Sequence, residues 1–269
     1  MTRPEWIESH PYLADASNLD SLVSSVLSET STVCTWVPTW NSYAADFRAG
    51  IPLLHRIKVD LTPAAVILKS LTNTLAEQVA HEGIRQQVQN IKTELGHDPS
   101  GALQAIHALV GTDELPPPCA GILRYLGWSA LAQYLHPVVS TFGTWRDEDQ
   151  WCRSYCPMCG ARPAMSQLVG IDSGRQRLLA CAFCGTRWQF RRTMCPFCDN
   201  EDDRLLRVLT IEGEDRLRID ACDACGGYLK TYIGTGDEDL LLADWTSIHL
   251  DILAQDRGLT RMAASLYQI

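Results

Sequence analysis

Four pairs of cysteines with the spacing C-x-x-C limit the fold of this chain more than any other feature. The pairs are Cys156-Pro-Met-Cys159, Cys181-Ala-Phe-Cys184, Cys195-Pro-Phe-Cys198 and Cys222-Asp-Ala-Cys225. Two residues between cysteines allow a tight turn to present both thiolates to one ion, and two such turns complete a tetrahedral shell of four sulfurs. The sequence therefore predicts two four-cysteine metal sites.

The intervals between the pairs indicate which of them share an ion. The first and third pairs begin 39 residues apart, and the second and fourth begin 41 residues apart, which is typical of a duplicated unit. This duplication favours the first pair binding with the second, and the third with the fourth. The interleaved arrangement, first with third and second with fourth, is the alternative. The expected ligands are Cys156, Cys159, Cys181 and Cys184 at one site and Cys195, Cys198, Cys222 and Cys225 at the other.

The residue after each pair fits a left-handed backbone turn. Glycine follows three of the pairs, at Gly160, Gly185 and Gly226, and it adopts this conformation at little steric cost. Asp199-Asn200 follows the third pair, and these two residue types are the next most tolerant. The four turns are thus predicted to share one geometry.

Cysteine chemistry also indicates the compartment and the kind of site. The chain has 11 cysteines, and its first residues lead into polar sequence rather than an apolar signal region. We therefore expect a cytoplasmic protein whose thiols stay reduced and bind metal. A shell of four thiolates leaves no position for substrate, and zinc and iron both accept it. A thioredoxin-like redox role is the weaker alternative, because that motif is a single C-x-x-C near a βαβ pattern.

The residues before the cysteine region have mostly helical spacing of apolar side chains. Helices are predicted over 62–95, as one long or kinked helix, over 99–111, and over 122–135, where Pro137 is expected to end the last one. Residues 1–60 show only a weak helical pattern and suggest no function. The helical part is predicted to be a packed bundle.

Short apolar runs of period two, such as 205–211 and 217–219, predict strands between Trp151 and Lys230. The tail is predicted to return to one helix, with Leu242, Trp245, Ile248 and Ile252 on one face. The predicted fold class is α+β. The predicted parts are a mostly helical N-terminal domain (1–148), two four-cysteine metal modules (149–190 and 191–233) and a C-terminal helical segment (234–269).

Charge and composition argue against several classes of function. The net charge is -9, and residues 151–230 carry 12 basic and 10 acidic side chains, a net charge of +2. A nucleic-acid-binding surface is usually far more basic, so nucleic acid is not an expected partner. No run of about 18 apolar residues occurs, so a membrane span is not expected. The seven histidines form no metal-spaced pair, and no constellation suits nucleophilic or acid-base catalysis, so the chain is not expected to be an enzyme.

The cysteine region resembles the FdhE family of formate dehydrogenase accessory proteins. The resemblance runs through the residues around each pair, including Arg187-Trp188 after the second pair and the ending Gly226-Gly227-Tyr228-Leu229-Lys230 after the fourth. It extends into the tail around Leu241 to Leu253 and covers about the last 120 residues. The residues before 150 match only in their helical character.

The resemblance implies a cytoplasmic maturation factor with two rubredoxin-like modules. Proteins of this family are associated with iron. They bind the catalytic subunit of respiratory formate dehydrogenases, a molybdenum or tungsten selenoprotein, before it is exported folded by the twin-arginine route. The eight cysteines carry over to the positions given above. The resemblance alone does not distinguish iron from zinc in this chain.

Arg187, Trp188, Arg191 and Arg192 lie in the ten residues that join the second and third pairs. Arginine and tryptophan are enriched at binding hot spots, so these four residues are candidates for partner binding. The alternative is a solvated linker with Trp188 packed against a metal turn. Two other functions remain open: a zinc-ribbon adaptor that binds nucleic acid or a transcription complex, and a small iron protein that transfers electrons.

Overall fold

The computed structural model describes residues 8, 11–36, 38–56, 59–96, 98–110, 120–147, 150–171, 174–236, 238 and 240–264. The chain forms two compact units. The first contains the described residues of 1–37 and 58–141, and the second contains those of 38–57 and 142–265. Residues 38–57 therefore group with the cysteine region. The predicted boundaries at 148, 190 and 233 stay predictions.

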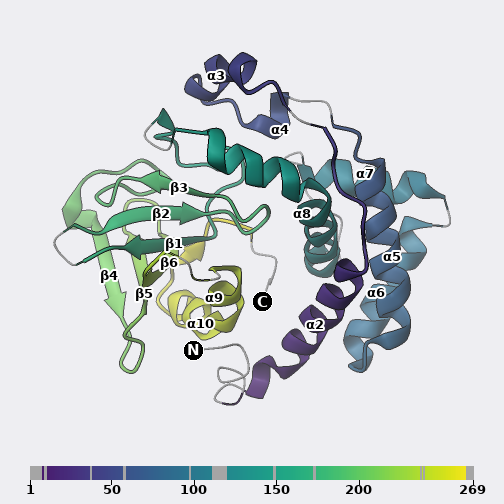
Figure 1. Ribbon diagram of the computed structural model, residues 1–269. Coiled ribbons are helices and arrows are strands. Elements are labelled where there is room, and N and C mark those ends of the chain that lie inside the picture. The colour runs from purple at the N-terminus through teal and green to yellow at the C-terminus, as the bar shows by residue number, and fades with distance from the viewer. Residues whose placement is uncertain are drawn as a thin grey trace. The chain divides into compact units, whose positions relative to one another are not determined.

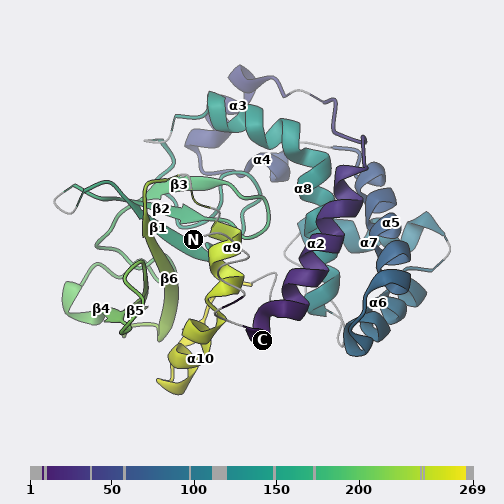
Figure 2. The same ribbon diagram turned by 60° about the horizontal axis from the view of Figure 1, so that its bottom comes forward.

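The first unit is a helical bundle, as predicted. Its elements are a 3₁₀ turn at Pro11–Leu13, α2 (Ala14–Ser28), α5 (Thr62–Gln78), α6 (Glu82–Leu95), α7 (Pro99–Val110) and most of α8 (Ala120–Trp145). Helix α5 contacts α2, α6 and α7, and Figure 2 shows α6 and α7 beside it. Leu68, Leu71 and Leu75 recur at helical spacing and are fully buried, so one apolar stripe of α5 organises the bundle.

Residues 62–95 form two helices, which corrects the prediction of one long or kinked helix. Helix α5 ends before Val79, whose backbone is extended. The ring Nδ1 of His81 then accepts a hydrogen bond from the amide of Ile84 at 3.3 Å and caps the start of α6. Histidine is not among the usual capping residues, so the break carries no ordinary sequence signal.

The prediction that Pro137 ends a helix is wrong, because α8 continues through it to Trp145. Proline in a helix interior removes one main-chain hydrogen bond and costs about 3 kcal/mol. Leu135 and Val138, on either side of Pro137, are both almost fully buried. Burying one such side chain contributes about 1.5–3 kcal/mol, so packing around the proline outweighs its cost.

The second unit begins with α3 (Trp40–Arg48) and α4 (Leu53–Arg56). Trp40, Tyr43 and Phe47 recur at helical spacing and contact Trp145 at the end of α8, with the Trp40 and Trp145 ring centroids 5.3 Å apart. Phe47 also stacks on Trp151, which is 1% exposed. These rings tie residues 38–57 to the start of the cysteine region.

The second unit also contains one mixed sheet. Its strands are β1 (Met165–Val169), β2 (Gln176–Ala180), β3 (Arg187–Phe190), β4 (Leu206–Thr210), β5 (Leu217–Cys222), β6 (Gly227–Gly234) and β7 (Thr260–Arg261). The order is β3-β2-β1-β6-β5-β4, with β7 paired to β6. Figure 1 shows the strands side by side in this order. The strands predicted over 205–211 and 217–219 correspond to β4 and β5.

The strand order repeats the duplication seen in the sequence. In each half, a cysteine pair precedes two antiparallel strands, a second cysteine pair follows, and a third strand pairs antiparallel with the second. The first strand of one half, β1, then pairs parallel with the last strand of the other, β6, with Met165 opposite Lys230. The two halves therefore share a single continuous sheet.

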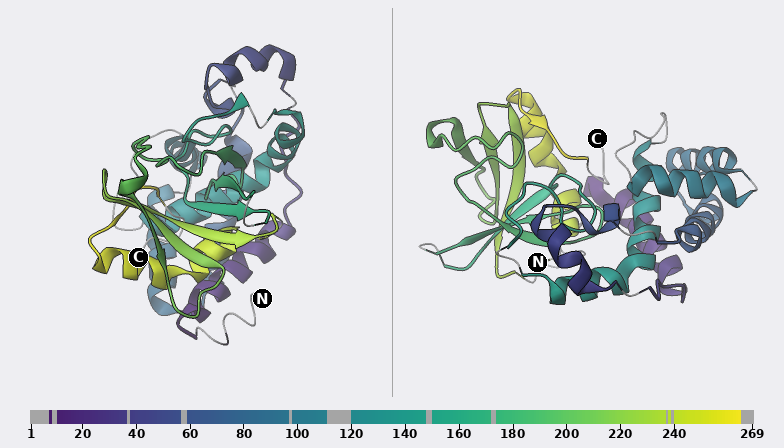
Figure 3. Two further views of the ribbon diagram at one scale, coloured as in Figure 1. Left: turned by 90° about the vertical axis from the view of Figure 1, so that its left-hand side faces the viewer. Right: turned by 90° about the horizontal axis from the view of Figure 1, so that it is seen from above.

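Helices α9 (Leu240–Thr246) and α10 (Ile248–Asp256) cover one face of this sheet, as the right-hand view of Figure 3 shows. Their core contacts include Leu240, Leu250 and Ala254 against β-sheet residues such as Ile219 and Tyr228. The tail thus forms two helices instead of the one predicted, and Ile252 is 47% exposed. None of the helices in the described residues is long and apolar enough to cross a membrane.

Candidate metal centres

Each cysteine pair sits in a turn of the same construction. In all four turns, the fourth residue after the first cysteine donates its amide to the carbonyl of that cysteine, as in Gly160 to Cys156 at 2.9 Å and Asp199 to Cys195 at 3.1 Å. The donating residue has positive φ each time, 56° at Asp199 and 68–80° at the three glycines. This confirms the predicted common geometry, and Asp199 replaces glycine because aspartate tolerates the left-handed region.

The turns come together in two groups of four sulfurs. One group holds Cys156, Cys159, Cys181 and Cys184, and the other holds Cys195, Cys198, Cys222 and Cys225, with the sulfurs of each group within 4.8 Å of one another. The pairing of first with second and third with fourth is therefore confirmed, and the interleaved alternative is excluded.

The distances between sulfurs fit one tetrahedral ion at each cluster. They are 3.5 Å for Cys156–Cys184 and Cys159–Cys181, and 3.7–3.8 Å for Cys198–Cys222 and Cys195–Cys225. A metal–sulfur bond of about 2.3 Å in a tetrahedron separates the sulfurs by about 3.8 Å. A disulfide would require about 2.05 Å. The donor set suits zinc or iron, and it supplies four ligands that fill the tetrahedral shell.

The two clusters differ in exposure. In the first, Cys156, Cys159 and Cys181 are buried and Cys184 is half-buried; in the second, Cys195 and Cys222 are buried, Cys225 is half-buried and Cys198 is exposed. Burial raises the pKa of the Cys181 thiol well above its ordinary value. A bound cation reverses this effect, because a coordinating thiol is deprotonated.

Residues 53–55 cover the first cluster, which the sequence did not indicate. The amides of Leu53 and Leu54 donate to the carbonyls of Pro157 and Met158 at 3.0 and 2.9 Å. The Nε2 of His55 lies 3.1 Å from the carbonyl oxygen of Cys159. A side chain at position 160 would approach His55 to 2.8 Å, so glycine also permits this close contact. The first cluster is thus held by a segment about 100 residues away in sequence.

The four candidates for partner binding do not share one exposed surface. Trp188 lies in β3, is 0% exposed and donates its ring N–H to the carbonyl of Arg153 at 2.9 Å. Arg187, also in β3, donates to Gln167 Oε1 at 3.1 Å and to the carbonyls of Gly236 and Glu238. Arg191 and Arg192 follow the strand and are exposed. Partner binding by these residues stays a prediction.

Two other cysteines of the described residues, Cys34 and Cys152, belong to neither cluster. Cys34 is buried in the first unit, and Cys152 is exposed in the second. Cys119 lies outside the described residues. Cys152 is the natural control for substitutions at the clusters.

We expect a chelator to remove metal from the second cluster about tenfold faster than from the first, a difference of about 1.4 kcal/mol in barrier. The reason is that Cys198 is exposed, whereas the first cluster is covered. Transfer of metal to a coloured chelator should therefore show two phases. The variant Cys198→Ser should lack the fast phase. A single phase, or loss of the slow phase in this variant, would contradict the assignment.

Comparison with known proteins shows which family these clusters resemble. The family model described as "FdhE, central domain" matches residues 155–192, which contain the first cluster. A protein named FdhE homolog from Aquifex aeolicus (strain VF5) is 31% identical over 138 residues, which are 49% of this chain and 48% of the relative. Protein FdhE of Salmonella paratyphi A is 32% identical over 139 residues, 50% of this chain and 44% of the relative. The chain thus spans about half the length of these relatives.

The fold matches a solved structure over nearly the whole chain. The crystal structure of the FdhE protein from Pseudomonas aeruginosa superposes with a TM-score of 0.70, covering 97% of this chain and 91% of that one at 21% identity. This match includes the helical unit, whose sequence resembles the family only in character. The predicted resemblance and fold class are therefore confirmed.

Proposed function

We propose that this chain, which matches the FdhE central-domain model over residues 155–192 and an FdhE protein in fold, is an accessory factor for a respiratory formate dehydrogenase. In this proposal it binds the catalytic subunit in the cytoplasm and supports its maturation before export, without a catalytic step of its own. The observation that carries the proposal is the pair of closed four-cysteine clusters, held in one sheet, in a chain similar to FdhE proteins.

The chemistry of the clusters favours a structural or electron-transfer role. Four thiolates fill a tetrahedral shell, so a bound zinc or iron ion would have no position open to substrate. Cys156, Cys159, Cys181 and Cys184 would hold one ion, and Cys195, Cys198, Cys222 and Cys225 would hold the other. Bound ions would fix the ends of the strands and thereby the surface that a partner meets.

A protein partner agrees with the surface charge better than nucleic acid does. Several exposed arginines of the cysteine region are paired with acidic side chains, as in Arg191–Glu201 at 2.8 Å and Arg207–Asp223 at 2.6 Å. Such pairs cancel the positive field that nucleic acids require. Of the four predicted contact residues, Arg191 and Arg192 are the ones that can meet a partner without local unfolding. We propose that these two contact the catalytic subunit.

The test is affinity capture of the tagged full chain from cytoplasm of cells that oxidise formate, with bound proteins identified by mass spectrometry. The expected result is recovery of a formate dehydrogenase catalytic subunit. Recovery should fall in a Cys156→Ser/Cys195→Ser variant and persist in Cys152→Ser. Replacement of Arg191 and Arg192 by alanine should weaken capture, whereas Arg204→Ala, another exposed arginine, should not.

Other outcomes of the capture would favour the alternative functions. Recovery of nucleic-acid machinery alone, with affinity falling steeply as salt rises, would replace the proposal by the zinc-ribbon adaptor. Two zinc ions per chain would exclude a redox role for the clusters, because zinc has no redox chemistry.

A further inference from the structure

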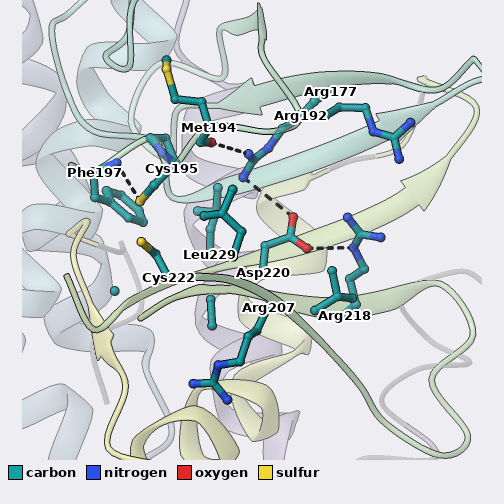
Figure 4. A pocket seen from close by; sticks show the side chains of 15 residues that line it. Arg177, Arg192, Met194, Cys195, Phe197, Arg207, Arg218, Asp220, Cys222 and Leu229 are labelled. Carbon is teal, nitrogen blue, oxygen red and sulfur yellow. Dashed lines mark hydrogen bonds and ion pairs between the residues drawn. The ribbon is translucent and has the colours of Figure 1, made fainter. Parts of the chain in front are cut away.

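A buried arginine from the repeat that carries the first cluster lies beside the second cluster. Arg177 belongs to β2, four residues before Cys181, and is 4% exposed. Its Nη1 donates to the main-chain oxygen of Met194 at 3.1 Å, directly before Cys195. A pocket of about 80 Å³ is lined by Arg177 together with Cys195 and Cys222, and Figure 4 shows the two sulfurs on one side of it.

Positive charge at this pocket exceeds the charge of the carboxylate that lines it. Asp220 Oδ2 lies 3.7 Å from Arg177 Nη2, and Asp220 Oδ1 lies 2.9 Å from Arg218 Nε. Two largely buried guanidinium groups thus share one carboxylate. Within the described part of the chain, the Nε of Arg177 has no hydrogen-bond acceptor. Burial lowers the pKa of Arg177 from its ordinary value, yet arginine stays charged in proteins.

The other two arginines of the pocket contribute less. Arg207 is 45% exposed and pairs with Asp223, and Arg192 is exposed. Water and salt screen exposed charges, whereas a buried charge acts on its neighbours through a lower dielectric. Arg177 is therefore the most buried arginine of the pocket, and its charge is the least screened by water.

A four-thiolate centre supplies the missing negative charge. Four thiolates around one divalent ion carry more negative than positive charge, and neighbouring groups that compensate it raise metal affinity. We infer that Arg177 is a positioning residue of the second metal centre: it compensates the charge of the metal–thiolate group and holds the Cys195 turn through Met194. The inference rests on the proposed occupancy of the second cluster by metal.

This arrangement also couples the two centres. Strand β2 carries Arg177 near one end and leads directly into Cys181 of the first cluster at the other. Metal at the first cluster fixes the end of β2 and so places Arg177 against the second. An empty first cluster is therefore expected to weaken the second, although the two share no ligand.

The test uses the full chain loaded with Cd²⁺ and titrated with a competing chelator. Cadmium-113 NMR reports each four-thiolate site by its own signal. In Arg177→Met we expect the affinity of the second site to fall by about 10–100-fold and its signal to shift, with the first site unchanged. Arg177→Lys keeps the charge and should recover most of the affinity. Arg257→Met, which removes an exposed arginine elsewhere, should behave as wild type.

Several results would overturn the inference. Wild-type affinity in Arg177→Met, or equal weakening of both sites in that variant and in Arg177→Lys, would do so. Inorganic phosphate that shifts the second signal in wild type but not in Arg177→Met would make the pocket a site for an external oxyanion instead. A wild-type chain that binds no Cd²⁺ at the second cluster would refute the proposed metal site itself, and that result is distinct from the others.

Discussion

Replacing Cys159 with serine is expected to remove one metal ion per chain and to unfold the turns and strand ends around the first cluster. Binding of a structural ion contributes about 10–16 kcal/mol to folding in zinc-finger peptides, so its loss exceeds the stability of a small module. The effect should spread to residues 53–55, because Leu53, Leu54 and His55 contact the turn that carries Cys159. The variant should therefore also expose α3 and its aromatic contacts.

Metal content and limited proteolysis measure this effect. Wild type should bind two ions per chain, Cys159→Ser one ion, and Cys152→Ser, an exposed cysteine outside both clusters, two ions. New protease cleavage in Cys159→Ser should fall within 38–57 and 155–186. Cys198→Ser should cause a smaller change, because its cluster is more exposed. Unchanged metal content together with unchanged protease resistance in Cys159→Ser would contradict the assignment.

The spacing of the cysteines predicted the clusters because their chemistry is local. A C-x-x-C turn needs only a few residues and one left-handed position, so Gly160 or Asp199 shows where the turn closes. The nearly equal intervals of 39 and 41 residues also identified the duplicated unit, and the structure repeats the same strand order in each half. Because two such turns complete one tetrahedral shell of four sulfurs, four turns predict two metal sites.

The sequence could not predict features that depend on contacts distant in the chain. Pro137 was expected to end a helix, but burial of its neighbours stabilises α8 beyond it. His55 and Trp40 lie in a segment with weak pattern, and their role depends on residues about 100 positions away. Arg177 occupies an inward strand position usually filled by an apolar residue, and this mismatch was the signal that could have identified it.

Replacing Lys230 with methionine is expected to destabilise the second unit by about 3–5 kcal/mol. Lys230 is 1% exposed, and its Nζ lies 2.8 Å from Asp244 Oδ1 and 2.7 Å from Asp251 Oδ2. Arg261 pairs with the same two carboxylates at 2.8 Å. Loss of Lys230 leaves two buried carboxylates with one cation. Removing one partner of a buried ion pair leaves an uncompensated buried charge, which costs far more than replacing the whole pair with apolar side chains.

This network attaches the tail to the sheet, because Lys230 lies in β6 whereas Asp244 and Asp251 lie in α9 and α10. Denaturant unfolding of the metal-loaded chain should show the loss for Lys230→Met, whereas Lys92→Met, an exposed lysine of α6, should change stability by less than about 0.5 kcal/mol. The double variant Lys230→Met/Asp251→Leu should recover part of the loss, since it removes one unpaired charge as well. If Lys230→Met were as stable as wild type, the ion pairs of Lys230 would not stabilise the second unit. Recovery in the double variant would instead show that the cost comes from the uncompensated carboxylate and not from lost packing at position 230.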